Sequence, residues 1–210
     1  MQMRAILRDV VKQYGDKLIL NSVNLEFSDN TRYAVVGASG IGKTTLLRLL
    51  AGLEKPDCGF VEVSTRSVIS YAFQEHRLFP ALTVMENMKA IEPEKDCEKI
   101  LDSLDLLSEA DSYPSSLSGG MRKRAGLARA LAKKADIYLI DEPTGGQDAR
   151  HCAMVAETIS TYTRDGLCII ATHDAELIAS VADILIVLNS DGFTLHHVHG
   201  KTADEIRGIM

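Results

Sequence analysis

The most constraining feature of this sequence is a glycine-rich stretch, residues 37–45, which lies between the apolar runs 33–36 and 46–50. Four residues separate Gly37 from Gly42, and a lysine and a threonine follow, which is the spacing of a phosphate-binding loop. Glycines let the backbone wrap so that its N–H groups and the positive end of the next helix point at one anion. The stretch therefore predicts a strand, a loop and a helix that together bind a nucleotide.

The side chains of this loop fit the same role. Lys43 can reach the β and γ phosphates of a nucleotide, and the Thr44 hydroxyl can ligate the Mg²⁺ that bridges them. The alternative is an ordinary glycine-rich turn, but the full pattern between a strand and a helix rarely arises by chance. We expect the nucleotide to be held by Gly37, Ala38, Ser39, Gly40, Ile41, Gly42, Lys43, Thr44 and Thr45.

Length and composition limit the remaining possibilities. The chain has 210 residues, 46% of them hydrophobic, which suits a single domain over residues 1–210. It has no apolar run near the roughly 20 residues that cross a bilayer and no apolar signal core at its start, so we expect a protein that neither spans a membrane nor is exported. Its four cysteines are scattered without zinc or redox spacing, and a net charge of −6 gives no general attraction for nucleic acid.

Hydrophobic patterns predict the secondary structure around the loop. Alternating residues at 3–11 and 18–27 predict antiparallel strands, and residues 56–59 predict a turn before a further strand at 60–63. From residue 78 to about residue 134 the apolar period changes from two to nearly four. This change predicts an inserted helical subdomain.

The second half of the chain has a different pattern. Short apolar runs at 137–140 and 167–171 alternate with helical stretches, which predicts strands buried on both faces. Residues 184–188 and 193–198 predict a closing hairpin. The predicted fold is α/β: a mostly parallel sheet with flanking helices, an N-terminal antiparallel β subdomain and an inserted α-helical subdomain.

Two carboxylates, Asp141 and Glu142, follow the apolar run 137–140, and His173 ends the next apolar strand. Open α/β sheets place ligands at the carboxyl ends of their strands. One carboxylate can hold Mg²⁺ through water while the next polarises an attacking water, and the imidazole can donate to a phosphate oxygen or orient that water. Polar residues at strand ends also serve as ordinary caps, but beside a phosphate loop the catalytic interpretation is favoured.

A second glycine-rich site, Ser118, Gly119 and Gly120, opens the helical stretch 122–132 and presents backbone N–H groups at a positive helix end. Ser118 is a good N-cap, but a cap does not require two glycines, which suggest that something approaches the backbone closely. The basic run 122–124 opposes the helix dipole and favours a nearby anion or acidic partner, unless it serves only solubility.

Together with Gln74 and Asp148, these motifs resemble, in the same order, those of the ATP-binding cassette family, the ATPase subunits of ABC transporters. The resemblance covers nearly the whole chain. It implies ATP as the substrate, Mg²⁺ as the cofactor, and Tyr14 stacked on adenine. It also implies that Glu142 is the general base, that Lys43, Gln74 and His173 complete the catalytic set, and that Thr44, Gln74 and Asp141 hold the metal.

The resemblance further implies a head-to-tail dimer, either with a second copy or with a homologous ATPase subunit. Residues 118–120 would close over the ATP of the other subunit, and Asp148 belongs to the segment that crosses the dimer. Two positions depart from the family pattern. Met121 stands where the family usually has Gln, and residues 145–147 are Gly-Gly-Gln instead of the commoner Ser-Ala-Leu.

Residues 74–87 resemble the region through which the importers of this family, especially those for nitrate and sulfonate, contact their permease. The resemblance therefore implies a cytoplasmic ATPase subunit, held at the inner face of the cell membrane by a separate transmembrane permease and serving solute import. The alternatives are a soluble ABC ATPase without a transport role and the ATPase subunit of an exporter. A P-loop kinase would leave residues 118–120 without a purpose.

Overall fold

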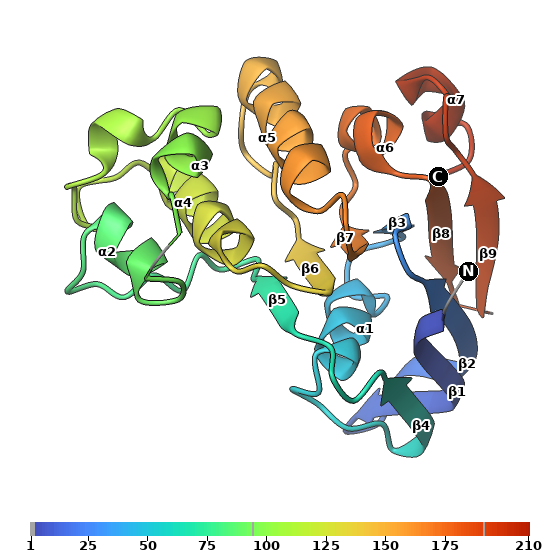
Figure 1. Cartoon of the computed structure of the whole chain (residues 1–210). Helices are drawn as coiled ribbons and strands as arrows, with labels where there is room; N and C mark the ends of the chain where they lie inside the picture. The colour runs from blue at the N-terminus through green and yellow to red at the C-terminus, as the bar shows by residue number, and fades with distance from the viewer. Residues whose placement is uncertain (1–2, 94, 191) are drawn as a thin grey trace.

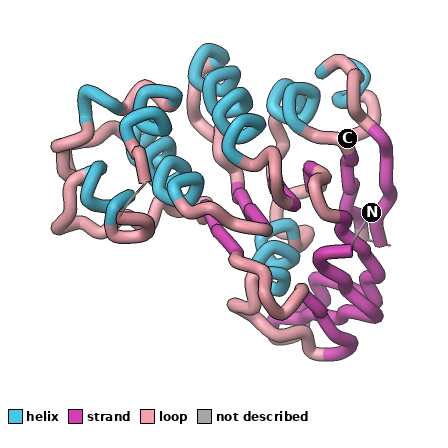
Figure 2. The backbone as a smooth tube through the Cα atoms, viewed as in Figure 1, coloured by secondary structure: helices cyan, strands magenta, loops and turns pink. Residues whose placement is uncertain are grey.

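The computed structural model describes residues 3–93, 95–190 and 192–210. These residues form two sheets, a three-stranded one in the order β2-β1-β4 and a six-stranded one in the order β5-β6-β7-β3-β8-β9 (Figure 1). Figure 2 shows that the strands of the smaller sheet gather at one corner, whereas helices line the opposite side of the molecule. The predicted combination of a parallel core, an antiparallel β part and a helical part is confirmed.

The six-stranded sheet determines where the functional segments meet. Neighbouring strands from β5 to β8 are parallel, and β9 returns antiparallel to β8 as the predicted closing hairpin. Parallel strands end at the same edge, so the residues that follow β3, β5, β6 and β7 come together there. The strands of the six-stranded sheet are β5 (Ile69–Ala72), β6 (Ile137–Asp141), β7 (Leu167–Ala171), β3 (Arg32–Val36), β8 (Ile184–Asn189) and β9 (Gly192–His197).

Both faces of this sheet are covered, which explains why β6 and β7 are buried at every position. In β7, Cys168 and Ile170 pack in a cluster with residues of α5, whereas Leu167 and Ile169 pack on the opposite side with residues of α1. The alternation follows from the two-residue period of a strand. The covering helices are α5 (Ala149–Tyr162), α6 (Ala175–Val181) and α7 (Ala203–Arg207) on one face and α1 (Lys43–Leu50), with the smaller sheet, on the other (Figure 1).

The smaller sheet consists of β1 (Met3–Tyr14), β2 (Lys17–Ser28) and β4 (Cys58–Val63), all antiparallel. The prediction of a turn over residues 56–59 is wrong for its second half, because Cys58 and Gly59 belong to β4. Gly59 has a φ of +76°, and a Cβ there would lie 2.3 Å from the carbonyl oxygens of Arg8 and Asp9. The glycine thus permits close strand pairing at an irregularity in the β1–β4 register.

The helices between residues 78 and 134 lie together at one end of the molecule (left in Figure 1). Their buried side chains, such as Met88 and Ile100, belong to the same cluster as those of β6 and α5, so the hydrophobic core is continuous. No helix in the described part of the chain is long and apolar enough to cross a membrane. These helices are α2 (Val84–Lys89), α3 (Glu98–Ser103), the short 3₁₀ helix η1 (Leu107–Glu109) and α4 (Gly119–Ala132).

Candidate functional site

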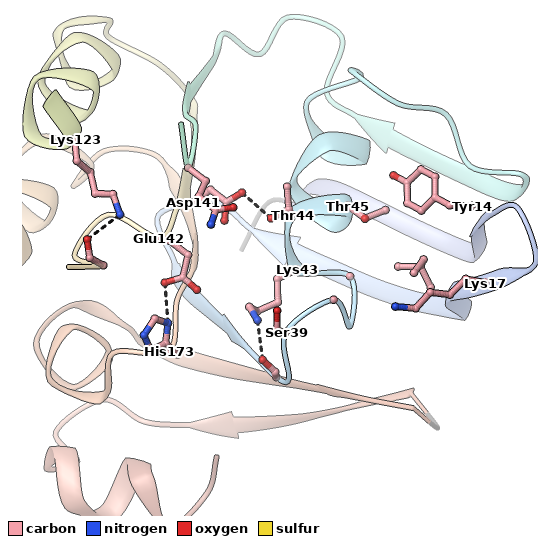
Figure 3. Close-up of a pocket in the computed structure, with 16 residues that line it drawn as sticks. Tyr14, Lys17, Ser39, Lys43, Thr44, Thr45, Lys123, Asp141, Glu142 and His173 are labelled. Carbon is pink, nitrogen blue, oxygen red and sulfur yellow. Dashed lines mark hydrogen bonds and ion pairs between the residues drawn. The ribbon is translucent and has the colours of Figure 1, made fainter. Parts of the chain in front are cut away.

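A cavity of about 800 Å³ lies at the edge of the sheet where the parallel strands end (Figure 3). It brings together the loop after β3, the segments after β5, β6 and β7, the tip of the β1–β2 hairpin and one residue of α4. The lining residues are Tyr14, Lys17, Ile19, Gly37, Ser39, Gly40, Gly42, Lys43, Thr44, Thr45, Gln74, Lys123, Asp141, Glu142, Gly145 and His173.

The loop between β3 and α1 depends on its glycines. Gly37 has a φ of +143°, and a Cβ there would lie 2.6 Å from the carbonyl oxygen of Leu188. Gly42 has a φ of +120°, and a Cβ there would lie 2.9 Å from Cγ2 of Ile19. Side chains at these positions would require φ values that only glycine adopts readily and would collide with neighbours. The loop therefore wraps tightly over the first turn of α1, with the positive end of that helix toward the cavity.

Lys43 and Thr44 point from the start of α1 into this cavity. The Lys43 ammonium donates to the carbonyl oxygens of Gly37 at 2.7 Å and Ala38 at 3.3 Å, so its side chain folds back along the loop. The Thr44 hydroxyl donates to the Asp141 carboxylate at 2.8 Å (Figure 3). This bond joins the phosphate loop to the end of β6 across 97 positions of sequence.

Asp141 is almost completely buried, with 3% of its surface exposed. Burial raises the pKa of its carboxyl, and the neighbouring Glu142 carboxylate raises this pKa further, while the Thr44 hydrogen bond opposes the shift. A carboxylate whose charge is disfavoured by its surroundings is well suited to a divalent cation, which would stabilise the charged form. The Thr44 hydroxyl, the Asp141 carboxylate and the exposed Gln74 amide are oxygen donors, the type of ligand that Mg²⁺ prefers.

Glu142 lines the cavity in a strained backbone conformation. Its φ is +49°, which costs roughly 1–3 kcal/mol for a residue with a side chain. Its N–H donates to the carbonyl oxygen of Ala171 at 2.8 Å, which fixes it beside β7. Its carboxylate lies 2.9 Å from Nδ1 of His173, so the predicted carboxylate and imidazole are brought together (Figure 3).

Tyr14 ends β1 and faces Lys17 across the tight turn of the β1–β2 hairpin. Its ring is 44% exposed and lines the cavity, and its hydroxyl donates to the Glu54 carboxylate. Partial burial and this hydrogen bond raise the pKa of the Tyr14 phenol. The ring is thus held at the rim of the cavity, beside Thr45 (Figure 3).

Two predicted site segments do not line this cavity. The Ser118 side chain caps α4 and accepts from the N–H of Met121 at 3.2 Å, and a Cβ at Gly119 would meet no atom within 4 Å. Asp148 is exposed and caps α5, accepting from the N–H of His151 at 3.0 Å. Both segments therefore face outward from their own chain, and the structure gives each an ordinary capping role there.

Sequence reasoning did not single out two lysines that line the cavity. Lys17 stands at the hairpin tip, three residues after Tyr14, and its proximity to the phosphate loop is decided by tertiary packing. Lys123 belongs to the basic run 122–124, and the expectation that this run lies near an anion was the available signal.

Comparisons with known proteins identify the family of this chain. A family model described as ABC transporter matches residues 20–145. The sulfate/thiosulfate import ATP-binding protein CysA of Pectobacterium atrosepticum is 37% identical over 207 residues, covering 87% of this chain. The chain belongs to the ABC transporter family. It spans 63% of the length of that CysA.

Further members of the ABC transporter family show the same relationship. The aliphatic sulfonates import ATP-binding protein SsuB 2 of Xanthomonas axonopodis pv. citri is 34% identical, with 95% of this chain and 69% of that protein covered. A dimeric structure of MJ0796, a bacterial ABC transporter cassette, superposes with a TM-score of 0.83 at 26% identity, covering 93% of this chain and 99% of that one.

The structure gives a physical account of one departure from the ABC transporter pattern. Met121 is partly buried and packs against the hydrophobic cluster that contains α4 and the neighbouring helices. Its side chain therefore contributes to packing.

Proposed function

We propose that this chain is the ATP-binding and ATP-hydrolysing subunit of an ABC transporter, that it dimerises on ATP, and that it drives a separate membrane permease. The observation that carries the proposal is the convergence of Lys43, Thr44, Asp141 and Glu142 in one cavity, with the Thr44–Asp141 hydrogen bond at its centre. Residues 1–210 act as a single ATPase domain, with the helical insertion at roughly 78–134.

Each side chain then has a role in binding. The backbone N–H groups of residues 37–45 and the Lys43 ammonium hold the phosphates, and Tyr14 stacks on adenine. Thr44, Gln74 and Asp141 hold Mg²⁺, which supplies positive charge for the triphosphate and its leaving group.

Glu142 is the general base of the reaction. Its carboxylate accepts the proton of a water whose oxygen attacks the γ phosphorus, while the bond to the β–γ bridging oxygen breaks to release ADP and phosphate. His173 orients the carboxylate through their 2.9 Å contact and can donate to a phosphate oxygen. The strained φ of Glu142 fits this role, because strain persists where the surrounding structure holds a group for function.

The outward-facing segments support a dimer. Ser118 and Gly119 are exposed, and their backbone N–H groups open a 14-residue helix, so they suit the phosphates of an ATP molecule held by another subunit. The solved cassette of MJ0796, a bacterial ABC transporter cassette, is dimeric. Asp148 lies in the segment that crosses between the two subunits.

The permease would contact the surface near Gln74. In this region Asn87 is completely buried, and its side chain bonds to the N–H and carbonyl of Phe79, which fixes a loop whose Phe79 ring is 47% exposed. A short helix of the permease could dock on this rigid surface and hold the subunit at the inner face of the membrane. The names of the relatives, a sulfate/thiosulfate importer and a sulfonate importer, support import of a small solute.

The test of the shared site mixes two inactive variants. Lys43→Ala chains mixed with Gly120→Asp chains give heterodimers in which one site carries both lesions and the other carries none. The control places both lesions on one chain and mixes it with wild type, which damages both sites of every heterodimer. We expect ATPase activity, or ATP-dependent dimerisation, to return only in the first mixture. No gain there, with both variants folded and chain exchange demonstrated, would refute the shared site.

A second experiment tests the transport role. Purification of the tagged chain from membranes should recover a multi-spanning permease, whose identity would indicate the solute. Recovery of only soluble partners would instead favour an ABC ATPase without a transport role.

A further inference from the structure

Helix α4 is hydrogen-bonded directly to the loop that follows Glu142. The Lys123 ammonium donates to the carbonyl oxygen of Gly145 at 2.9 Å, across the mouth of the nucleotide cavity (Figure 3). A Cβ on residue 145 would lie only 3.0 Å from the Lys123 Nζ atom. The glycine that departs from the family pattern at this position thus lets the lysine reach the carbonyl oxygen without the small shift that a Cβ would require.

Gln147 makes the second contact between this loop and α4. The Gln147 amide donates to the Pro143 carbonyl at 2.8 Å and accepts from the Arg124 guanidinium at 3.3 Å. Arg124 is 6% exposed, and its Nε donates to the carbonyl oxygen of Leu104 at 2.9 Å. A buried guanidinium fixed at both ends is expensive to move, because its hydrogen bonds would have to be broken without replacement by water.

These two sets of hydrogen bonds connect the Ser118 end of α4 with the loop that follows Glu142. Lys123 and Arg124 lie within two turns of Ser118 on the same helix, and an α-helix transmits displacement as a rigid body. The loop that is hydrogen-bonded to α4 begins one residue after Glu142. The strained backbone conformation of Glu142 persists only because the surrounding structure stabilises it. These hydrogen bonds form a continuous path from the Ser118 end of α4 through Gly145 and Gln147 to the backbone next to Glu142.

We propose that Lys123 and Gln147 are positioning residues that fix the loop after Glu142 to α4, so that contact at the Ser118 end of α4 sets the position of the general base. The proposal rests on the ATPase function proposed above. It also gives two of the departing residues a role: Gly145 accepts from the lysine without a nearby Cβ, and Gln147 supplies both a donor and an acceptor. The competing explanation is that Lys123 contacts the nucleotide itself.

The first test compares Lys123→Met with Lys133→Met. Lys133 also belongs to the α4 segment, at its opposite end, and makes an ion pair with Glu92 at 3.0 Å outside the cavity, so it is a matched control. In Lys123→Met we expect kcat to fall about ten- to hundredfold, the effect of misplacing a catalytic group by about 1 Å. ATP affinity should fall much less than kcat, because one of the three lysines that line the cavity is lost while the phosphate loop is untouched. Lys133→Met should keep both values.

The second test displaces the ammonium without removing it. Gly145→Ala places a methyl group 3.0 Å from Lys123 Nζ, so the end of the lysine must shift by about a few tenths of an ångström, and the φ of Gly145 lies outside the left-handed region, so alanine adds no backbone strain there. We expect a smaller loss of kcat than in Lys123→Met, and no further loss when Gly145→Ala is added to Lys123→Met, because both changes act on one contact. Backbone hydrogen exchange over residues 143–148 should quicken in each variant, with and without nucleotide.

The outcomes separate the possibilities. A rise in the ATP dissociation constant with unchanged kcat in Lys123→Met would overturn the proposal in favour of direct nucleotide contact. A loss of kcat in Gly145→Ala that adds in full to the loss in Lys123→Met would also overturn it, because the two changes would then act on different contacts. If wild type itself does not bind and hydrolyse ATP, the proposed function fails, but hydrogen exchange still tests the contact between Lys123 and the loop. Unchanged exchange over residues 143–148 in Lys123→Met would show that Lys123 does not fix the loop.

Discussion

Replacement of Glu142 by glutamine should separate ATP binding from hydrolysis. The amide keeps the size of the carboxylate, so its outer end can still lie beside Nδ1 of His173, which is 2.9 Å from the Glu142 carboxylate in wild type. What the variant loses is the ability to accept a proton from the attacking water. The geometry of the cavity and its phosphate loop should therefore remain intact.

The expected loss follows from the role of the group. A positioned general base contributes about 10²- to 10⁴-fold to the rate, or roughly 2.7–5.4 kcal/mol at 1.36 kcal/mol per tenfold. Binding should not weaken. Three lysines and two carboxylates line the cavity in wild type, so removing one carboxylate lessens the repulsion toward a triphosphate. We expect an equal or lower ATP dissociation constant and a dimer that persists with Mg-ATP.

Three measurements test this prediction: phosphate release for kcat, ATP titration for affinity, and gel filtration with and without Mg-ATP over a range of protein concentrations. Glu157→Gln, on the exposed side of α5, makes the same chemical change away from the cavity and should behave like wild type. If Glu142→Gln keeps more than about a tenth of wild-type kcat, the carboxylate is not the base. A variant that binds ATP but stays monomeric would count against closure of a shared site.

Tyr14→Ala should weaken ATP binding by about 1–2 kcal/mol if the ring stacks on adenine, whereas Tyr14→Phe, which keeps the ring, should bind ATP nearly normally. A titration in which Tyr14→Ala binds ATP as tightly as wild type would exclude stacking. Gly59→Ala should lower the free energy of unfolding by more than about 2 kcal/mol in urea titrations, because the φ of +76° is strained for alanine and the new Cβ would lie 2.3 Å from two carbonyl oxygens. The control is Gly52→Ala, whose φ of +68° brings the same strain but whose Cβ meets open space. It should lower the free energy of unfolding by less. Burial raises the pKa of the Cys168 thiol from its ordinary 9.0 to about 12. The unfolded chain therefore releases this proton first, so this contribution to stability is complete below about pH 9 and is lost as the pH rises toward 12. Urea titrations at pH 8 and 10 should show a smaller loss of stability in Cys168→Ala than in wild type, and identical losses would contradict the shift.

The sequence by itself determined the features that depend on contiguous residues. The loop of residues 37–45 has its geometry set by Gly37 and Gly42, whose φ values few other residues adopt, so its pattern could be interpreted without a structure. The burial of β6 and β7 on both faces follows from uninterrupted apolar runs. The caps of α4 and α5 likewise follow from single residues, Ser118 and Asp148, at helix starts.

Only the tertiary structure decided which distant residues meet. The sheet order places β6, β7 and β3 side by side although they are far apart in sequence, and this order brings Thr44 within 2.8 Å of Asp141. Gly59 belongs to a strand because β1 pairs with it, a non-local contact that overrides the local preference of glycine for turns. The glycine at position 145 could be interpreted only once Lys123, 22 residues away, was found against its carbonyl oxygen, because local sequence fixes backbone conformation but not the packing of one element against another.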